Sequence, residues 1–249
     1  MVLKSKFEVI FHARTKEDLA RVKEIKHEIP EAQGVLASFG VIIKSDVLEL
    51  FEPEGILNIH PSLLPKYRGA SPIESAILSG DTDFSVSIMK LVKAMDAGPV
   101  YYQTTLKDLP LDKAVIYREL AIVGAGWICD NINHLPAPVE QDESRATFCG
   151  KFDKSMSILR PETESAAEIL RKIVAFQGFP KAKYVFYDKN CAILKAHILK
   201  SGEIAVLPLK CADGAIIAVD RLQPDGKKPM DAKSFLNGYR KNNYPTNLL

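Results

Sequence analysis

GILNIHPSLLPKYRG, residues 55–69, joins a short apolar run to a loop rich in proline and polar side chains. Residues 55–60 are mostly apolar and stop at Pro61, a pattern that predicts a strand ending there. Since alternate residues of a strand share one face, Asn58 and His60 should point the same way. Ligands bind at the carboxyl ends of strands in open α/β sheets. The stretch therefore predicts a functional site at the end of a strand.

A carboxylate from a later segment is a candidate partner for this pair of side chains. Asp96 lies in the short segment MDAG (95–98), between two strand-like runs. Gly98 allows that turn to fold tightly, so the turn can bring Asp96 to the same crevice. Taken singly, Asn58, His60 and Asp96 are more often turn formers, caps or satisfied structural groups. Their combination, together with the surrounding sequence, indicates a site.

The first part of the chain, 1–145, alternates between strand-like and helix-like patterns. This alternation is typical of an α/β domain with a Rossmann-like, mostly parallel sheet. Runs of β-branched and aromatic residues predict the strands, and apolar residues at helical spacing predict the helices. The expected strands are 7–12, 34–43, 55–60, 84–92 and 98–106, and the expected helices are 15–29, 46–51, 72–78 and 111–134.

The chain changes character after residue 145. The composition shifts toward Pro, Asp, Glu, Ser and Thr, and we expect a linker at 146–163, whose first part can still pack on the first domain. Residues 164–249 form the expected second domain, with one helix followed by short strand-like runs separated by turns. That pattern is typical of a small antiparallel β-barrel resembling an OB-fold. The expected elements are a helix at 164–176 and strands at 184–188, 191–199, 202–209 and 214–223.

Composition limits the class of protein. Hydrophobic residues make up 47% and charged residues 26% of the chain. These proportions are typical of a globular protein. No apolar run approaches the roughly 20 residues that span a bilayer, and the N-terminus lacks a signal-peptide core, so we expect a cytoplasmic protein without a membrane partner. The four cysteines show no CxxC pair, and no cluster has metal-ligand spacing, so we expect reduced thiols and no metal.

Charge is distributed unevenly along the chain. Residues 1–149 carry 16 Lys and Arg against 21 Asp and Glu, whereas residues 150–249 carry 17 against 10. A basic second half favours a polyanionic partner. An excess of solvated lysines is the alternative, and charge alone does not separate the two.

Three motifs give the chain a resemblance to a known family. NIH at 58–60, SLLP at 62–65 and MDAG at 95–98 resemble, in this order, the shared motifs of the folate-dependent formyltransferases. The segments KYRGASPI (66–73) and CADGAIIAVDRLQPDGKKPMDAKSFLNG (211–238) resemble the branch of that family that acts on methionyl-tRNA. The resemblance covers roughly residues 8–249. It implies a formyltransferase domain at 1–145 and an OB-like tRNA-binding domain at 164–249.

The resemblance implies a reaction and a role for each candidate residue. The formyl group of 10-formyltetrahydrofolate would pass to the amine of methionyl initiator tRNA through a tetrahedral intermediate. Asn58 and a protonated His60 would donate hydrogen bonds to its oxyanion. Asp96 would favour the protonated His60 and would take or relay the proton lost by the amine. The donor is a substrate, and the reaction requires no metal and no DNA partner.

The same resemblance implies binding residues for the two substrates. We expect the loop after the strand to line the folate site and two further segments to form its apolar walls, with simple core packing as the alternative for Leu63 and Leu64. The expected folate-site residues are Ser62, Leu63, Leu64, Pro65, Val41, Ile43, Val92 and Met95. Basic side chains would meet the tRNA backbone, which they position without reading its sequence. The expected tRNA-binding residues are Arg68, Lys195, Lys200, Lys210, Arg221, Lys227 and Lys228. For Arg68, contact with the glutamate tail of the folate and exposure to solvent are equal alternatives.

Two departures from the family pattern keep alternatives open. The strand, glycine turn and helix that open the family's first domain have no counterpart here, so we expect either an N-terminally shortened member or a start upstream of Met1. In FQGFP (176–180), Phe179 stands where the family usually has Trp before the proline. A formyltransferase acting on an amino sugar nucleotide, or a catalytically impaired tRNA- or folate-binding protein, are the alternatives.

Overall fold

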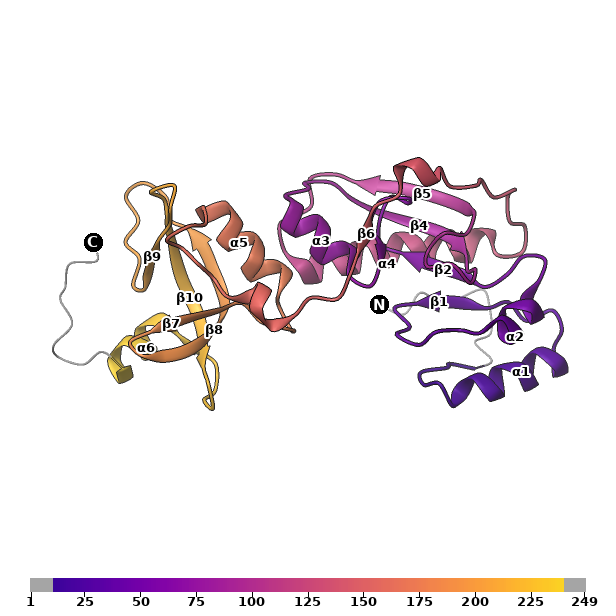
Figure 1. Ribbon diagram of the computed structural model, residues 1–249, viewed down its shortest axis with the longest axis horizontal. Coiled ribbons are helices and arrows are strands. Elements are labelled where there is room, and N and C mark those ends of the chain that lie inside the picture. The colour runs from indigo at the N-terminus through magenta and orange to yellow at the C-terminus, as the bar shows by residue number, and fades with distance from the viewer. Residues whose placement is uncertain (1–10, 240–249) are drawn as a thin grey trace. The chain divides into compact units, whose positions relative to one another are not determined.

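The computed structural model describes residues 11–239, which form two compact units (Figure 1). Unit 1 runs up to Ile73 and also includes Thr82–Pro110 and Ala114–Gly150. Unit 2 contains Glu74–Asp81, Leu111–Lys113 and the residues from Lys151 onward. Contacts therefore divide the chain close to residue 150, and two short segments of the first half belong to unit 2.

The sheet of unit 1 is mixed. Its order is β1–β2–β4–β5, formed by Val35–Ala37, Leu57–His60, Phe84–Lys90 and Val100–Leu106. β1 and β2 are parallel, but β2 pairs antiparallel with β4, and β4 pairs antiparallel with β5. The α/β class is confirmed, and the prediction of a mostly parallel sheet is wrong for the described strands. The segment between β4 and β5 is too short for a crossover, so they form a hairpin.

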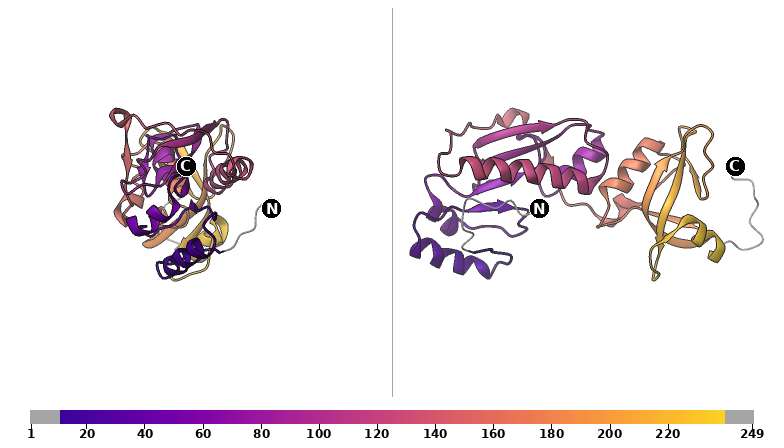
Figure 2. Two further views of the ribbon diagram at one scale, coloured as in Figure 1. Left: turned by 90° about the vertical axis from the view of Figure 1, so that its right-hand side faces the viewer. Right: turned by 180° about the vertical axis from the view of Figure 1, so that it is seen from behind.

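One face of this sheet is covered by α4 (Lys113–Asn131), as Figure 2 shows from behind. The helix approaches closely at Gly124, where an added Cβ would lie 2.9 Å from Ile59 Cγ2 and 3.4 Å from Val86 Cγ2. Ile59 therefore points toward α4. Because side chains alternate along a strand, Asn58 and His60 point to the opposite face.

The remaining elements of unit 1 are short. α1 (Asp18–Glu28) opens with a reciprocal pair of hydrogen bonds, in which Thr15 Oγ1 accepts from the Asp18 N–H and the Asp18 carboxylate accepts from the Thr15 N–H. This is the opening that the sequence predicts at Thr15. The other elements are α2 (Ser45–Leu48), η1 (Glu49–Phe51), β3 (Arg68–Gly69), α3 (Pro72–Ser79, which continues into unit 2), η2 (Glu143–Arg145) and β6 (Phe148–Cys149).

Two expected strands of unit 1 differ from the structure. Residues 7–10 of the strand expected at 7–12 lie outside the described residues, and residues 11–14 have no regular structure. The strand expected at 34–43 is reduced to β1, and residues 38–44 are irregular. An apolar run predicts burial or a binding wall as readily as a strand, which is why the run alone overestimates its length.

Unit 2 is a curled antiparallel sheet with helices. Its order is β11–β10–β8–β7, with β9 also on β10, and every pair is antiparallel. These pairings form a half-barrel. The strand expected at 202–209 is limited to β9, because residues 201–205 form a turn and an irregular segment in which Ile204 is 86% exposed. The elements are η3 (Lys154–Ser157), α5 (Ala166–Ala175), β7 (Lys183–Phe186), β8 (Lys189–Ile198), β9 (Pro208–Lys210), β10 (Ile216–Pro224), β11 (Met230–Asp231) and α6 (Ala232–Tyr239).

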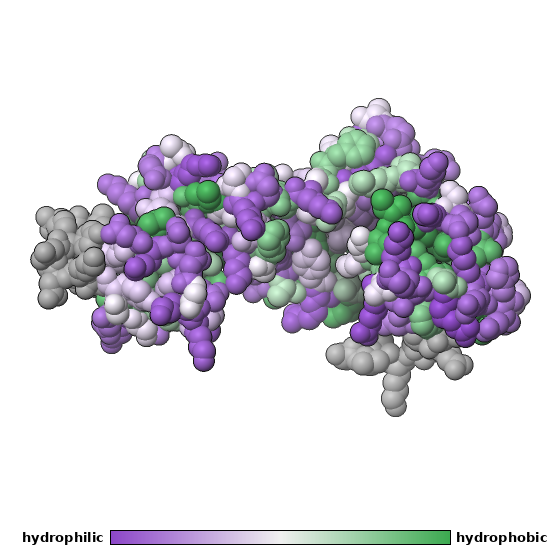
Figure 3. All heavy atoms as spheres, turned by 60° about the horizontal axis from the view of Figure 1, so that its bottom comes forward, coloured by the Kyte–Doolittle hydropathy of each residue, from purple (hydrophilic) through white to green (hydrophobic). Residues whose placement is uncertain are grey.

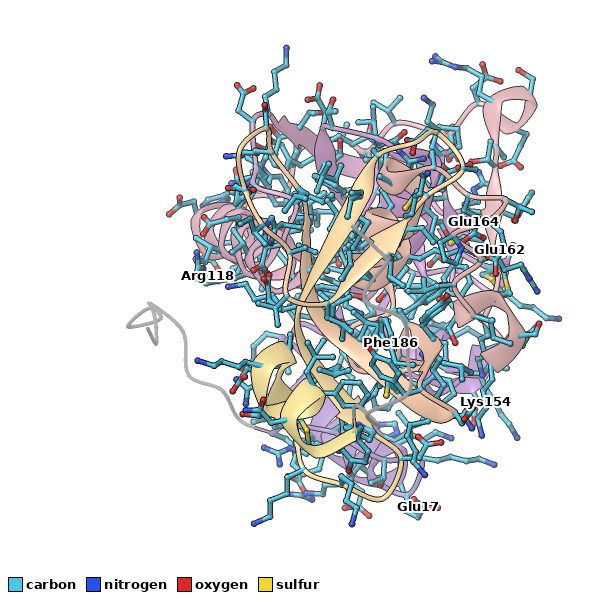
Figure 4. All side chains as sticks on the ribbon, turned by 90° about the vertical axis from the view of Figure 1, so that its left-hand side faces the viewer. Glu17, Arg118, Lys154, Glu162, Glu164 and Phe186 are labelled. Atoms are coloured by element: carbon cyan, nitrogen blue, oxygen red, sulfur yellow. The ribbon has the colours of Figure 1, made fainter. Side chains whose placement is uncertain are left out.

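The core of unit 2 lies between the curled sheet and its helices. α5 begins with a capping box, in which Ser165 accepts from the Glu168 N–H and Glu168 accepts from the Ser165 N–H. The rings of Phe186 and Phe235 of α6 meet edge to face, with their centroids 6.1 Å apart. Figure 4 shows Phe186 inside the unit, with Glu162 and Glu164 at one side. Ile169 and Ile173 on the apolar face of α5 belong to the same buried cluster as Phe186 and Phe235, and this face therefore stabilises the half-barrel.

Two further features bear on the expectations from composition. Within residues 11–239, no helix combines the length and the apolar character needed to cross a membrane. All four cysteines are free thiols, and burial raises the pKa of Cys191 to about 11. A thiol with so high a pKa is a poor nucleophile at neutral pH.

Candidate active site

The end of β2 places Asn58 and His60 on one buried face of unit 1. Asn58 has register partners in both β1 and β4, and His60 has one in β4, so the sheet fixes the backbone of both residues. Asp96 reaches them from the loop between β4 and β5. Its Oδ1 lies 3.5 Å from Asn58 Nδ2 and 3.7 Å from His60 Nδ1. The structure thus brings together the three side chains that the motifs single out.

The turn that carries Asp96 is tightly built. Asp96 has a φ of 48°. A positive value is unusual for a residue with a side chain. An added Cβ at Gly98 would lie 2.0 Å from the Lys90 carbonyl oxygen, so the turn has room only for glycine there. The second carboxylate oxygen, Oδ2, accepts a 2.8 Å hydrogen bond from the Gly69 N–H, and Asp96 is therefore fixed by the loop that follows β2.

His60 carries its proton on the nitrogen away from Asp96. His60 Nε2 lies 3.0 Å from the Tyr67 carbonyl oxygen. Because a carbonyl only accepts, Nε2 holds the hydrogen. Burial lowers the pKa of His60, and this effect outweighs the opposing effects of Asp96 and the Tyr67 carbonyl. Asp96 thus favours the protonated form of His60, as expected, but burial favours the neutral form more strongly. The protonated His60 expected from the resemblance is therefore not the resting form, in which the Nδ1 lone pair faces the carboxylate.

The loop after β2 is held by a polar row across the sheet. His60, Ser87 and Gln103 are register partners on β2, β4 and β5, so they share a face. Ser87 Oγ donates to the Ser62 carbonyl and accepts from the Leu64 N–H, and Gln103 Nε2 donates to the Leu64 carbonyl. The loop is thereby anchored to the sheet beside His60.

The residues expected at the folate site occupy several environments. Ser62 Oγ donates to the Lys66 carbonyl at 2.6 Å, so this hydroxyl supports the loop. Leu64 is buried, as the core alternative requires, whereas Leu63 is 41% exposed, and Pro65 follows a cis peptide bond. Ile43 packs against a buried cluster formed by Val47, Phe51 and Ile56. Leu91, the neighbour of Val92, packs against the same cluster. Val41 and Val92 are half-buried.

Apolar side chains also remain accessible on unit 1. Met95, next to Asp96, is 66% exposed, and Ile42 is more exposed still. Figure 3 shows apolar surface over this unit among hydrophilic surroundings. Exposed apolar groups beside a polar constellation are typical of a site that receives a flat organic ligand.

Arg68 is the one expected tRNA-binding residue that the structure contradicts. Its side chain is only 2% exposed, and its guanidinium donates to Gln141 Oε1 and to both carboxylate oxygens of Glu143. A buried Arg with four of its five N–H donors engaged in this way is not accessible to a phosphate of a tRNA backbone. The sequence places Arg68 in a polar loop, but that loop is covered by the segment after α4.

Sequence reasoning missed Gln141, Glu143 and Thr147. The expected linker does pack on unit 1 at its start, because β6 pairs in parallel with β3 and the Thr147 carbonyl accepts from the Arg68 N–H. A single polar residue in a polar segment is usually solvated, so nothing in one sequence singles out Gln141. Within the described residues, no three His, Cys, Asp or Glu side chains gather in a way that could hold a metal ion.

Replacing Arg68 by Met should lower the free energy of unfolding by about 2–3 kcal/mol, because the change removes several buried hydrogen bonds and leaves Gln141 Oε1 without its donors. The control is Glu143→Gln, at a side chain that is 68% exposed. Its effect should be smaller, because glutamine keeps an acceptor oxygen for the Arg68 guanidinium and its own side chain remains in contact with water. Urea denaturation measures both. Equal effects of the two changes would contradict the buried role of Arg68.

The fold and the site together define a formyltransferase. The family model described as "Formyl transferase" matches residues 3–120, and the one described as "Formyl transferase, C-terminal domain" matches residues 153–240. A methionyl-tRNA formyltransferase of Dehalococcoides mccartyi strain CBDB1 is 35% identical over 239 residues, which cover 90% of this chain and 74% of that protein. The chain therefore belongs to the formyltransferase family.

Solved structures share the fold. The methionyl-tRNA formyltransferase from Clostridium thermocellum has a TM-score of 0.64 at 20% identity, covering 84% of each chain. A variant of HypX from Aquifex aeolicus has a TM-score of 0.72 at 18% identity, covering 90% of this chain and 43% of HypX. At these identities the likeness concerns the fold alone.

Proposed function

We propose that this enzyme transfers the formyl group of 10-formyltetrahydrofolate to the amino group of methionyl initiator tRNA. The single observation that carries the proposal is the approach of Asn58, His60 and Asp96 at the end of β2. Relatives that are 35% identical to this chain bear the name methionyl-tRNA formyltransferase. Charged tRNA is a cytoplasmic substrate, and we place the enzyme there.

Asn58 would stabilise the oxyanion of the tetrahedral intermediate. Its side-chain amide carries two N–H groups. One of them points toward Asp96, with the nitrogen 3.5 Å from Oδ1. The other would donate to the formyl oxygen as negative charge develops on it. A donor positioned in this way, on a rigid strand and shielded from water, lowers a barrier by about 3–4 kcal/mol.

His60 and Asp96 would move the proton. When the neutral amine attacks the formyl carbon, the amine nitrogen becomes positively charged and must lose one proton. His60 Nδ1 and Asp96 Oδ1 face each other with their lone pairs, 3.7 Å apart. Together they can accept the proton that the amine loses. The imidazolium then donates it to N10 of the folate, the leaving group, so the amine loses one proton and N10 gains one.

The folate would occupy the accessible side of the trio. Its pterin ring would contact the wall segments that hold Val41, Ile43 and Val92, with Leu63 and Met95 exposed nearby. The backbone of the loop Ser62–Pro65 is the remaining wall. Flat rings bind well to such apolar surfaces with a few backbone donors and acceptors.

The tRNA backbone would meet the basic side chains of unit 2. Lys195 and Arg221 are cross-strand neighbours on β8 and β10, and both are exposed. Two adjacent cations on one face can contact one phosphate or two successive ones. The other exposed cations expected to contribute are Lys200, Lys210, Lys227 and Lys228.

A transfer assay tests the proposal. The protein is incubated with 10-formyltetrahydrofolate and with either methionyl initiator tRNA or an amino sugar nucleotide. Formylation of the tRNA alone supports the proposal. Formylation of the sugar alone, or binding of tRNA without transfer under conditions in which His60 is neutral, would reject it in favour of the alternatives.

The His60 imidazole of the free protein should titrate below about pH 6.5, the ordinary pKa of histidine. Burial lowers the pKa of His60. The neutral form that accepts a proton therefore persists as the pH falls through that value and is lost only at lower pH. An NMR titration without substrate measures this pKa apart from that of the substrate amine, which is about 8, and His60→Asn assigns the signal. A His60 pKa above neutral would show that the resting imidazole is charged.

A further inference from the structure

The segment between α4 and unit 2 is hydrogen-bonded to the turn that carries Asp96, to the chain after that turn and to the loop after β2. Val139 exchanges two backbone hydrogen bonds of 2.8 Å with Val100, and further along β6 pairs with β3. Between these two attachments lies Gln141. All of these residues belong to unit 1, so the segment connects the two catalytic loops within one compact body.

Gln141 uses its whole side-chain amide to connect two loops. Nε2 donates to the Asp96 carbonyl at 2.9 Å and to the Gly98 carbonyl at 2.7 Å. Oε1 accepts from Arg68 Nη2 at 2.8 Å and from Arg68 Nε at 3.1 Å. Both N–H groups and the oxygen are thus engaged. One partner lies in the turn that carries Asp96, and the other precedes Gly69, whose N–H binds the Asp96 carboxylate.

The conformation of Asp96 depends on bonds of this kind. A residue with a side chain at positive φ is disfavoured by about 1–3 kcal/mol and persists only where its surroundings hold it. The Gly69 N–H holds the carboxylate, and Gln141 holds the carbonyl of the same residue. Without Gln141, the turn would lose two of the bonds that fix its backbone.

We propose that Gln141 is a positioning residue for the formyl transfer. By holding the Asp96–Gly98 turn against the loop that contains Arg68, its side chain sets the distance from Asp96 to Asn58 and His60. The inference rests on the proposed function. Gln141 contacts backbone carbonyls and Arg68, and it acts on the reaction only through Asp96. A displacement of about 1 Å in a catalytic group can lower a rate about 100-fold.

The main test is Gln141→Met, which keeps the length of the side chain and removes its hydrogen bonds. We expect kcat to fall about 10- to 100-fold and KM for either substrate to change less than about two-fold. The matched control is Glu143→Gln, which alters the other partner of Arg68 and leaves the contacts of Gln141 in place. It should keep kcat near the wild-type value. Unchanged kcat in Gln141→Met would overturn the proposal.

A titration of His60 by NMR separates positioning from general loss of structure. Asp96 raises the pKa of His60 against the larger effect of burial. A turn released from Gln141 should therefore lower that pKa further. His60→Asn assigns the signal among the five histidines. A loss of kcat with the pKa of His60 unchanged would overturn the proposal.

A second variant guards against misfolding of the first. Gln141→Glu retains the acceptor for Arg68 but places an oxygen against the two carbonyls, so its kcat should also fall at least about 10-fold while the protein stays folded. Wild-type kcat in this variant would reject the role. If the wild type formylates no tRNA, the proposed function fails, and the His60 titration of Gln141→Met still decides whether Gln141 positions Asp96.

Discussion

Asp96→Asn should lower kcat about 1,000-fold and leave the melting temperature nearly unchanged. An amide has nearly the same shape and can still accept from the Gly69 N–H. It cannot take the proton that the attacking amine must lose. His60 Nδ1 would also lose the carboxylate that stabilises its charged form. Single-turnover rates of formyl transfer measure the chemical step directly.

The control for this variant is Asp142→Asn. Asp142 caps η2 at the surface through the Ser144 N–H. An asparagine caps equally well, so turnover should be unchanged. If Asp96→Asn retained more than about a tenth of the wild-type rate, proton transfer in this site would have to follow a route that excludes Asp96.

Gly69→Ala should lower the free energy of unfolding by about 4 kcal/mol and lower activity as well. Gly69 has a φ of 123°, and an added Cβ would lie 2.0 Å from the Cys149 carbonyl oxygen. Residues with side chains rarely adopt such a φ. The oxygen is backbone of β6, so the loop must move. The movement would withdraw the N–H that fixes the Asp96 carboxylate.

Gly126→Ala is the matched control for Gly69. Gly126 lies inside α4, where an added Cβ would have no neighbour within 4 Å. Alanine favours a helix by up to about 1 kcal/mol over glycine, so this change should be neutral or stabilising. Thermal and urea denaturation of both variants give the comparison. A Gly69→Ala variant as stable as the wild type would show that β3 and β6 are not held against each other as described.

Sequence patterns are reliable where local chemistry decides the outcome. Apolar spacing predicts the helix at 164–176, and it is present as α5 with the Ser165 capping box. The strand end at His60 and the tight turn at Gly98 are also predicted, because proline and glycine act through their own backbone. The sequence does not predict whether two strands pair parallel or antiparallel, because an apolar run has the same pattern in either case.

The protonation state of His60 depends on its three-dimensional surroundings and cannot be predicted from the sequence. The sequence pairs His60 with Asp96, and that pairing by itself favours a charged imidazole. In the structure His60 is buried, and the cost of removing a charge from water exceeds the attraction of the carboxylate. A pKa depends on solvent exposure, and exposure is a property of the folded molecule.

The linear order of residues by itself determined which groups can do the chemistry: an amide and an imidazole two residues apart on a strand, and a carboxylate before a glycine turn. The tertiary structure alone decided that Arg68 belongs to the interior and that Gln141 joins the two loops. Local patterns reflect the preferences of neighbouring residues. Contacts between residues far apart along the chain depend on the whole domain being folded.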